Sequence, residues 1–260
     1  MGWSETATTM RKDYLAERHH IVPQVVAAMT SSGVAPDHGA AEARAQAWYE
    51  CWLDKAADEI WLLQQPDRAV VEFHGLDEVL EAYRRAGGVL LLGTHFGAHT
   101  LSWVQLDRLG HALTILVHEA MMAVVGNYGL QHVTWMTPGG GFQRAVAEGA
   151  PGLWVTYTDV GLDGAPLRLE AGKFVEESPG IRMAAATPLP VFAADFSALT
   201  EVNGRRMRSA FRGVGSDARA AKLRSWLDGE LAARAQDWML WRRVPVEGHR
   251  GLEVGWHGDR

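Results

Sequence analysis

The residues best suited to chemistry lie in the stretch GTHFGAH at positions 93–99, which directly follows an apolar run at residues 89–92. A histidine between a buried strand and a following helix lies at the edge of a sheet, where a ligand can reach it. The N–H groups at the start of that helix can oppose negative charge on a reacting oxygen. His95 is therefore a candidate general base, and Gly97 marks the turn that would support an oxyanion.

A metal site is a competing interpretation of the same stretch, because His95 and His99 are four residues apart and can lie on one helix face. The residues between them lack the glutamate of zinc hydrolases, and no third ligand is marked nearby. Gly97 is also a poor residue for the middle of a helix. We therefore expect no metal, and we expect His99 to line a substrate pocket or to lie exposed on the helix.

Alternating strand and helix patterns surround this stretch. Apolar runs predict strands at residues 69–73, 89–92, 113–117, 152–158 and 189–193. Helical patterns occupy residues 77–85, 99–109, 141–148, 181–186 and 218–243. Strands separated by helices form βαβ units, so the sequence predicts an α/β fold with a central mixed, largely parallel sheet flanked by helices.

A helical layer is predicted before the sheet. Apolar residues recur at helical spacing between residues 14 and 29, a Ser-Ser-Gly sequence interrupts them, and residues 40–63 resume the pattern. Trp48, Trp52 and Trp61 are predicted to pack in the core or to form an interfacial face. We divide the chain into a helical N-terminal layer at 1–66, an α/β domain at 67–247 and an exposed tail at 248–260, forming one structural unit.

The composition limits the class of protein. The chain has 260 residues, a net charge of -6 and 47% hydrophobic residues, which indicate a folded globular protein with no nucleic-acid partner. Cys51 is the only cysteine, so no disulfide can form within the chain and a cytoplasmic location is expected. No apolar run approaches the ~20 residues of a membrane-spanning helix, so we expect peripheral membrane contact at most.

Further motifs accompany the histidine stretch in order along the chain. WVTYTD at positions 154–159 resembles a strand ending in aspartate, SPG at 178–180 starts a helix, and QDWMLWRR at 236–243 is rich in tryptophan and arginine. Together with residues 74–100, they resemble the lipid A biosynthesis lauroyl/myristoyl acyltransferase family, part of the lysophospholipid and glycerolipid acyltransferase superfamily. The resemblance covers roughly residues 70–245, and several ordered motifs are more specific than one.

Members of this family transfer an acyl group from an acyl-carrier-protein or acyl-CoA thioester to a hydroxyl group. Their motif is a histidine, four residues and a carboxylate that orients and charges the histidine. His95 matches this motif, but Thr100 occupies the acidic position. A neutral hydrogen bond from threonine contributes only about 1 kcal/mol, roughly half of what a carboxylate would supply to an imidazolium.

This departure leaves three interpretations open. In the first, the acceptor is an amine, whose lone pair needs less help from the base than an alcohol does. In the second, Asp159 or Glu119, at or just beyond strand ends, supplies the missing charge. In the third, catalysis has been lost, and the protein binds an acyl chain or a carrier protein.

From the resemblance we expect a divergent cytoplasmic acyltransferase of specialised metabolism, with a small-molecule acceptor and an acyl carrier protein or CoA thioester as the donor. This phosphopantetheine-linked thioester is a cosubstrate, and no tightly bound cofactor is expected. The expected catalytic residues are His95, Thr100 and Asp159, and the expected substrate-binding residues are Gly97, His99, Glu119, Ser178 and Gly180. The alternatives are the non-catalytic binding protein and a peripheral lipid acyltransferase.

A short basic cluster completes the candidates. Arg205, Arg206 and Arg208 could receive an acidic carrier protein or the phosphate of phosphopantetheine. A charge run of this kind is more often a solvated surface. The carrier-binding interpretation therefore depends on where the three side chains lie relative to His95.

Overall fold

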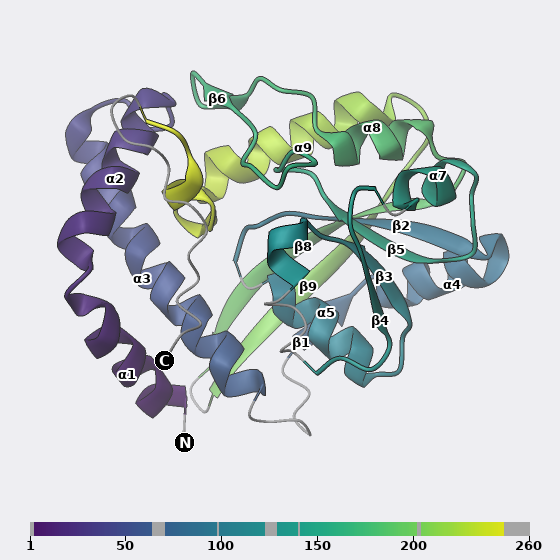
Figure 1. Ribbon diagram of the computed structural model, residues 1–260, viewed down its shortest axis with the longest axis horizontal. Coiled ribbons are helices and arrows are strands. Elements are labelled where there is room, and N and C mark those ends of the chain that lie inside the picture. Colours follow the sequence, from purple (N-terminus) through teal and green to yellow (C-terminus); the bar gives the residue numbers. More distant parts are fainter. Residues whose placement is uncertain are drawn as a thin grey trace.

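A seven-stranded sheet forms the centre of the protein, with helices on both faces and three N-terminal helices packed at one end (Figure 1). The computed structural model describes residues 3–63, 71–97, 99–122, 129–139, 141–201 and 204–246, and for residues 3–4, 59–63, 120, 198–201 and 204–207 it describes the backbone alone. The predicted α/β fold, with its mixed, mostly parallel sheet and its N-terminal helical segment, is confirmed.

The strands of the large sheet lie in the order β1-β9-β8-β2-β5-β3-β4. The parallel strands are β2 (Gly88–Gly93), β3 (Leu113–Leu116), β4 (Val133–Met136), β5 (Gly152–Tyr157) and β8 (Val191–Glu201). Two strands run the opposite way, β9 (Gly204–Val214) beside β8 and β1 (Val71–His74) beside β9. A separate hairpin joins β6 (Leu169–Glu170) and β7 (Lys173–Phe174). The site therefore lies on a sheet whose central strand, β2, has parallel neighbours on both sides.

Each face of the sheet has its own hydrophobic core, because β2 is buried throughout and alternate residues point to opposite faces. Leu90 and Leu92 belong to the core under α7 (Phe142–Ala147), α8 (Pro179–Ala186) and α9 (Arg219–Arg234). Val89 and Leu91 belong to the core under α4 (Leu76–Ala86) and α5 (His99–Arg108). The two cores hold β2 in place, and with it the loop that carries His95.

The N-terminal helices are α1 (Trp3–Leu15), α2 (Arg18–Ser31) and α3 (His38–Leu63). Most buried hydrophobic residues of α2 and α3 join the same core as α9, Tyr14 of α1 packs against it, and Trp48 is fully buried there. Trp52 is partly buried and lines a pocket, whereas the side chain of Trp61 lies outside the described residues. The interpretation of these tryptophans as core residues therefore holds for Trp48.

The C-terminal helix is shorter than predicted. It ends at Arg234, and the chain continues as two short 3-10 turns, η3 (Ala235–Asp237) and η4 (Trp241–Arg243). Both Trp238 and Trp241 are buried in the core, in the segment that follows the end of α9. The predicted tail at 248–260 lies outside the described residues.

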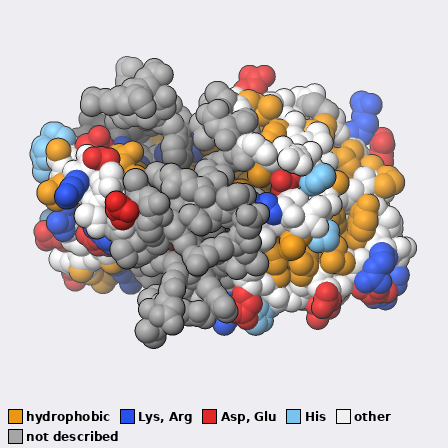
Figure 2. All heavy atoms as spheres, turned by 90° about the horizontal axis from the view of Figure 1, so that it is seen from below, with side chains coloured by type: hydrophobic (Ala, Val, Ile, Leu, Met, Phe, Trp, Pro, Cys, Tyr) orange, Lys and Arg blue, Asp and Glu red, His pale blue; other side chains and the backbone are white. Residues whose placement is uncertain are grey.

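The sequence-based assignment also missed β9, which contains the arginine cluster. It missed β4 as well, and the strand predicted at 189–193 continues to Glu201 as β8. The other predicted strands and helices are present, with small shifts at their ends apart from the shortened C-terminal helix. No helix in the described part of the chain has the length and apolar character needed to cross a membrane. Acidic and basic side chains are interspersed on the described part of the face in Figure 2.

Candidate active site

The site lies where two neighbouring parallel strands send the chain to opposite faces of the sheet. The chain leaves β2 toward α5, which packs in one core, and leaves β5 toward α8, which packs in the other. This divergence opens a crevice at the carboxyl ends of the strands. Gly93 pairs with Tyr157 in the register of β2 and β5, so His95 and Asp159, each two residues further along, meet at the crevice.

His95 and Asp159 form a hydrogen-bonded pair. The His95 Nδ1 atom lies 2.9 Å from Asp159 Oδ1, and the backbone N–H of His95 donates to Asp159 Oδ2 at 2.8 Å. The Asp159 side chain is fully buried, whereas the His95 side chain is 20% exposed. The carboxylate fixes the ring through Nδ1 and leaves Nε2 as the nitrogen available to the pocket.

The environment of Asp159 favours its charged form. Burial alone raises the pKa of Asp159, but the charge of His95 and hydrogen bonds from His95 and Trp238 outweigh burial. The pKa of Asp159 therefore lies below its ordinary value. An ionised carboxylate in this position can stabilise a proton that His95 takes up.

The segment after α9 hydrogen-bonds to both His95 and Asp159. Trp238 Nε1 donates to Asp159 Oδ2 at 2.8 Å, and the carbonyl of Trp238 accepts a hydrogen bond from Trp48 Nε1 at 2.8 Å. The backbone N–H of Met239 donates to the carbonyl of His95 at 2.9 Å. Residues far apart in the sequence thus fix both members of the pair.

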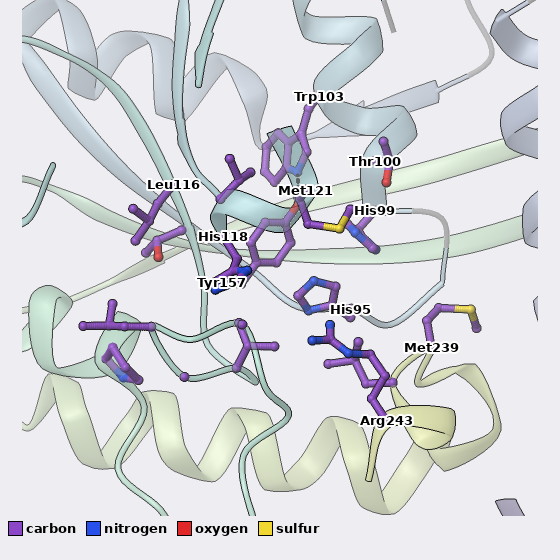
Figure 3. A pocket seen from close by; sticks show the side chains of 18 of the residues that line it. His95, His99, Thr100, Trp103, Leu116, His118, Met121, Tyr157, Met239 and Arg243 are labelled. Carbon is purple, nitrogen blue, oxygen red and sulfur yellow. Dashed lines mark hydrogen bonds between the residues drawn. The ribbon is translucent and has the colours of Figure 1, made fainter. Parts of the chain in front are cut away.

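The pocket in front of His95 has largely apolar and aromatic walls (Figure 3). Its apolar lining residues are Trp52, Trp103, Leu116, Val117, Met121, Trp135, Pro138, Tyr157, Val160, Leu162, Pro179, Met239 and Leu240. Its polar and charged lining side chains are Lys55, His95, His99, Thr100, His118, Thr156 and Arg243. Within the part of the chain that the structure describes, the lining contains cations and neutral groups but no carboxylate, since Asp159 lies behind His95.

His99 is the second histidine of the pocket, and it differs from His95 in its surroundings. The side chain is buried, its ring centroid lies 4.8 Å from that of His95, and its Nδ1 atom has no hydrogen-bond partner among the described residues. Burial lowers the pKa of His99 well below its ordinary value, and the nearby charges of Lys55 and His95 add to this effect. His99 is therefore neutral, and it lines the pocket beside His95.

Two expectations about the histidine loop need correction. Thr100 lines the pocket, but the bond that orients His95 comes from Asp159 instead. Gly97 has φ +61, and its N–H donates to the carbonyl of Asp237 at 2.9 Å, so this N–H is not free for an oxyanion. Thr100 is thus a lining residue of the pocket, and Gly97 provides the positive φ that the turn after β2 requires.

Three predicted substrate-binding residues do not line the pocket. Ser178 is buried at the start of α8, where its hydroxyl accepts a hydrogen bond from the N–H of Ile181 at 3.2 Å. Gly180 lets α8 approach β5, because a Cβ there would lie 2.5 Å from the carbonyl oxygen of Tyr157. Glu119 is exposed on the turn η1 (Glu119–Met121) and does not contact His95. These residues shape or border the site without touching its cavity.

The arginine cluster lies on β9, beyond the end of β2. Arg208 is exposed and pairs in register with Ser197 of β8, and it does not line the pocket. The side chains of Arg205 and Arg206 lie outside the described residues. The carrier-binding prediction therefore stays untested.

Several pocket residues were missed by sequence reasoning. Tyr157 stacks on His95 with ring centroids 4.4 Å apart, and its hydroxyl accepts a hydrogen bond from Trp103 Nε1 at 2.8 Å. Tyr157 lies inside the WVTYTD motif and Arg243 inside QDWMLWRR, so the motifs marked the right segments. Lys55 comes from α3, and no local pattern singled it out.

No protein-family model matches this chain, and no curated protein matches it either. Among the described residues, no group of three or more His, Cys, Asp or Glu side chains could hold a metal ion. The geometry supplies a histidine held by a carboxylate, a neutral histidine beside it and an apolar pocket in front of both. This arrangement can accept a proton from a hydroxyl or amine bound in the pocket.

Proposed function

We propose that the protein is an acyltransferase that moves an acyl group from a thioester, carried by an acyl carrier protein or CoA, to an amine or hydroxyl of a small molecule. The observation that carries the proposal is the His95–Asp159 pair, with its 2.9 Å hydrogen bond, at the mouth of a largely apolar pocket. The sequence motifs that resemble lipid A acyltransferases lie around this pair. The proposed setting is the cytoplasm, where Cys51 stays reduced.

In the proposed reaction, His95 Nε2 takes the proton of the acceptor as its oxygen or nitrogen attacks the thioester carbonyl carbon. Asp159 stabilises the imidazolium that forms. The tetrahedral intermediate then collapses, the carbon–sulfur bond breaks, and the leaving thiolate receives the proton from His95. The products are the ester or amide and the free thiol of the carrier.

The pocket supports this chemistry in two ways. Its apolar wall suits an acyl chain or the apolar body of an acceptor. His99 lines the same space with a neutral ring, so it adds no charge next to His95. The amine acceptor was one way to explain the absence of a carboxylate at position 100. Because Asp159 gives His95 a charged partner, an amine and a hydroxyl acceptor fit the site equally well.

The test is intact-mass detection of acyl transfer from a panel of acyl-CoA and carrier-bound thioesters to amine and alcohol acceptors. We expect H95A to lower the rate about 10²–10⁴-fold, the usual contribution of a positioned base, and D159N to lower it less. H132A is the matched control, because His132 is exposed at the opposite end of the sheet, and its rate should equal that of the wild type. Unchanged transfer by H95A would overturn the mechanism.

The same assay separates the proposal from its alternatives. A thioester that binds but never yields product, with every acceptor tried, would support a non-catalytic acyl-chain or carrier-binding protein. Transfer only to lipids presented in vesicles would support a peripheral lipid acyltransferase. Both alternatives keep the apolar pocket but assign a different role to His95.

A further inference from the structure

Arg243 is a charged pocket residue that the proposed reaction does not use. It lies in η4, and its side chain points into the pocket toward His95 (Figure 3). The side chain is partly buried, and its guanidinium makes no hydrogen bond or ion pair among the described residues. Its neighbour Arg242, by contrast, lies over the ring of Trp52 at 5.3 Å.

Arg234, at the end of α9, has the carboxylate partners that Arg243 lacks among the described residues. Arg234 pairs with Asp195 at 2.6 Å and with Asp237 at 2.8 Å. Asp163 influences Arg243 electrostatically, but its Oδ1 accepts a hydrogen bond from the N–H of Ala165 at 3.0 Å, and the two side chains form no ion pair. A partly buried cation is unfavourable unless it is paired, and no carboxylate of the described residues pairs with Arg243, whose side chain lines the cavity.

The charged side chains around the cavity also favour an anionic ligand. Lys55 lines the cavity together with Arg243, and its charge acts on His99. No carboxylate of the described residues lines the cavity, and the buried Asp159 is already hydrogen-bonded to His95. Arg243 therefore places a cation in a cavity whose walls are largely apolar.

We propose that this pocket binds a substrate that joins an apolar body to an anionic oxygen group, a carboxylate or a phosphate, and that the Arg243 guanidinium holds this group. A guanidinium offers donors in a planar fork that matches either anion. The anion would belong to the acceptor or to the phosphopantetheine arm of the donor. The proposal rests on the proposed function for this assignment of substrates, but anion binding can be measured without any turnover.

The experiment measures equilibrium binding of dodecanoate, dodecanol and CoA by titration calorimetry, using the full chain. We expect R243Q to bind dodecanoate or CoA at least tenfold more weakly than the wild type and to bind dodecanol equally well. R243K should keep part of the affinity, because the charge remains while the planar fork is lost. R224Q is the matched control, since Arg224 is exposed on α9 outside the pocket.

Each outcome decides the proposal. Dependence of dodecanoate binding on Arg243 supports an anion on the chain-bearing substrate, and dependence of CoA binding supports the donor phosphate. Equal affinity of R243Q and wild type for both anions would overturn the proposal, as would an equal loss of dodecanol binding. Anion binding through Arg243 without any acyl transfer would refute the acyltransferase and leave this inference standing.

Discussion

Two histidines share the pocket, and their surroundings give them different chemistry. His95 lies against the Asp159 carboxylate, which stabilises a positive charge on its ring. His99 is buried beside the charge of Lys55, and its pKa is lowered, so it stays neutral. Burial therefore keeps His99 neutral, and the role of proton acceptor that we propose belongs to His95, which has the carboxylate partner.

The first prediction at this scale concerns stability and pH. Burial lowers the pKa of His99 below its ordinary value of 6.5, so below pH 6.5 the unfolded chain binds a proton that the folded protein does not. The contribution of His99 to stability is complete above pH 6.5 and is lost as the pH falls from there toward the folded pKa. Denaturant unfolding between pH 8 and about 5 should therefore show a smaller decrease for H99F than for the wild type.

The control for this prediction is H132F, which removes an exposed histidine from the other end of the sheet. Its pH dependence should follow that of the wild type. If H99F and the wild type lose stability equally as the pH falls, His99 is not held neutral by burial.

The sequence identified His95 but could not choose its partner. Thr100 occupies the position where the resembling family has its acid, and Asp159 and Glu119 were both candidates for the missing charge. The choice depends on β2 lying beside β5 in a register that pairs Gly93 with Tyr157. Strand order and register are long-range properties, so no local pattern around His95 contains them.

At the scale of elements, the start of α8 determines how closely the loop after β5 is held. Ser178 caps the helix, Pro179 occupies its first turn, and Gly180 contacts the end of β5. A Cβ on Gly180 would meet the carbonyl oxygen of Tyr157, a backbone atom that cannot move away alone. Asp159 lies two residues beyond Tyr157, so the packing of α8 acts on the position of the carboxylate.

A pair of glycine substitutions tests this contact. We expect G180A to lower the free energy of unfolding by about 1–3 kcal/mol, the usual effect of overpacking, and to lower the transfer rate. G229A is the matched control in α9, because a Cβ there would meet nothing within 4 Å. It should raise stability by about 0.5–1 kcal/mol, since alanine is the better helix residue. Thermal or denaturant unfolding of both variants measures the change in stability. Equal changes in the free energy of unfolding for G180A and G229A would show that the contact between Gly180 and Tyr157 is not tight.

The missed strand β9 shows what limits sequence reasoning for elements. Its residues alternate in character, with Arg208 and Arg212 on one face and Ser209 and Phe211 on the other, as the period of a strand requires. The arginines made the segment resemble a solvated charge run. A strand near the edge of a sheet buries little apolar surface, so its pattern is weaker than that of β2.

At the scale of the whole molecule, one chain of hydrogen bonds joins the N-terminal helices to His95. Trp48 on α3 donates to the carbonyl of Trp238, the Trp238 indole donates to Asp159, and Asp159 accepts from His95. We expect Trp238 to act as a positioning residue, because it touches the carboxylate and not the pocket.

Two tryptophan substitutions in the same segment test this role. W238F removes the N–H that donates to Asp159, so it should lower kcat for transfer on the order of tenfold with little change in KM. W241F removes an N–H that donates to the carbonyl of Ala235. We expect W241F and W238F to lower the free energy of unfolding by similar amounts, but only W238F to lower kcat. An equal effect of both variants on kcat would mean that Trp238 has only a structural role.

The long-range contacts of the site also determine when it can form during folding. The His95–Asp159 bond joins residues 64 positions apart, and the Trp48–Trp238 bond joins residues 190 positions apart. Contacts between such distant residues require most of the chain to be in place, so they form late compared with helices. Regained activity after denaturation therefore marks the completion of folding, not the return of secondary structure.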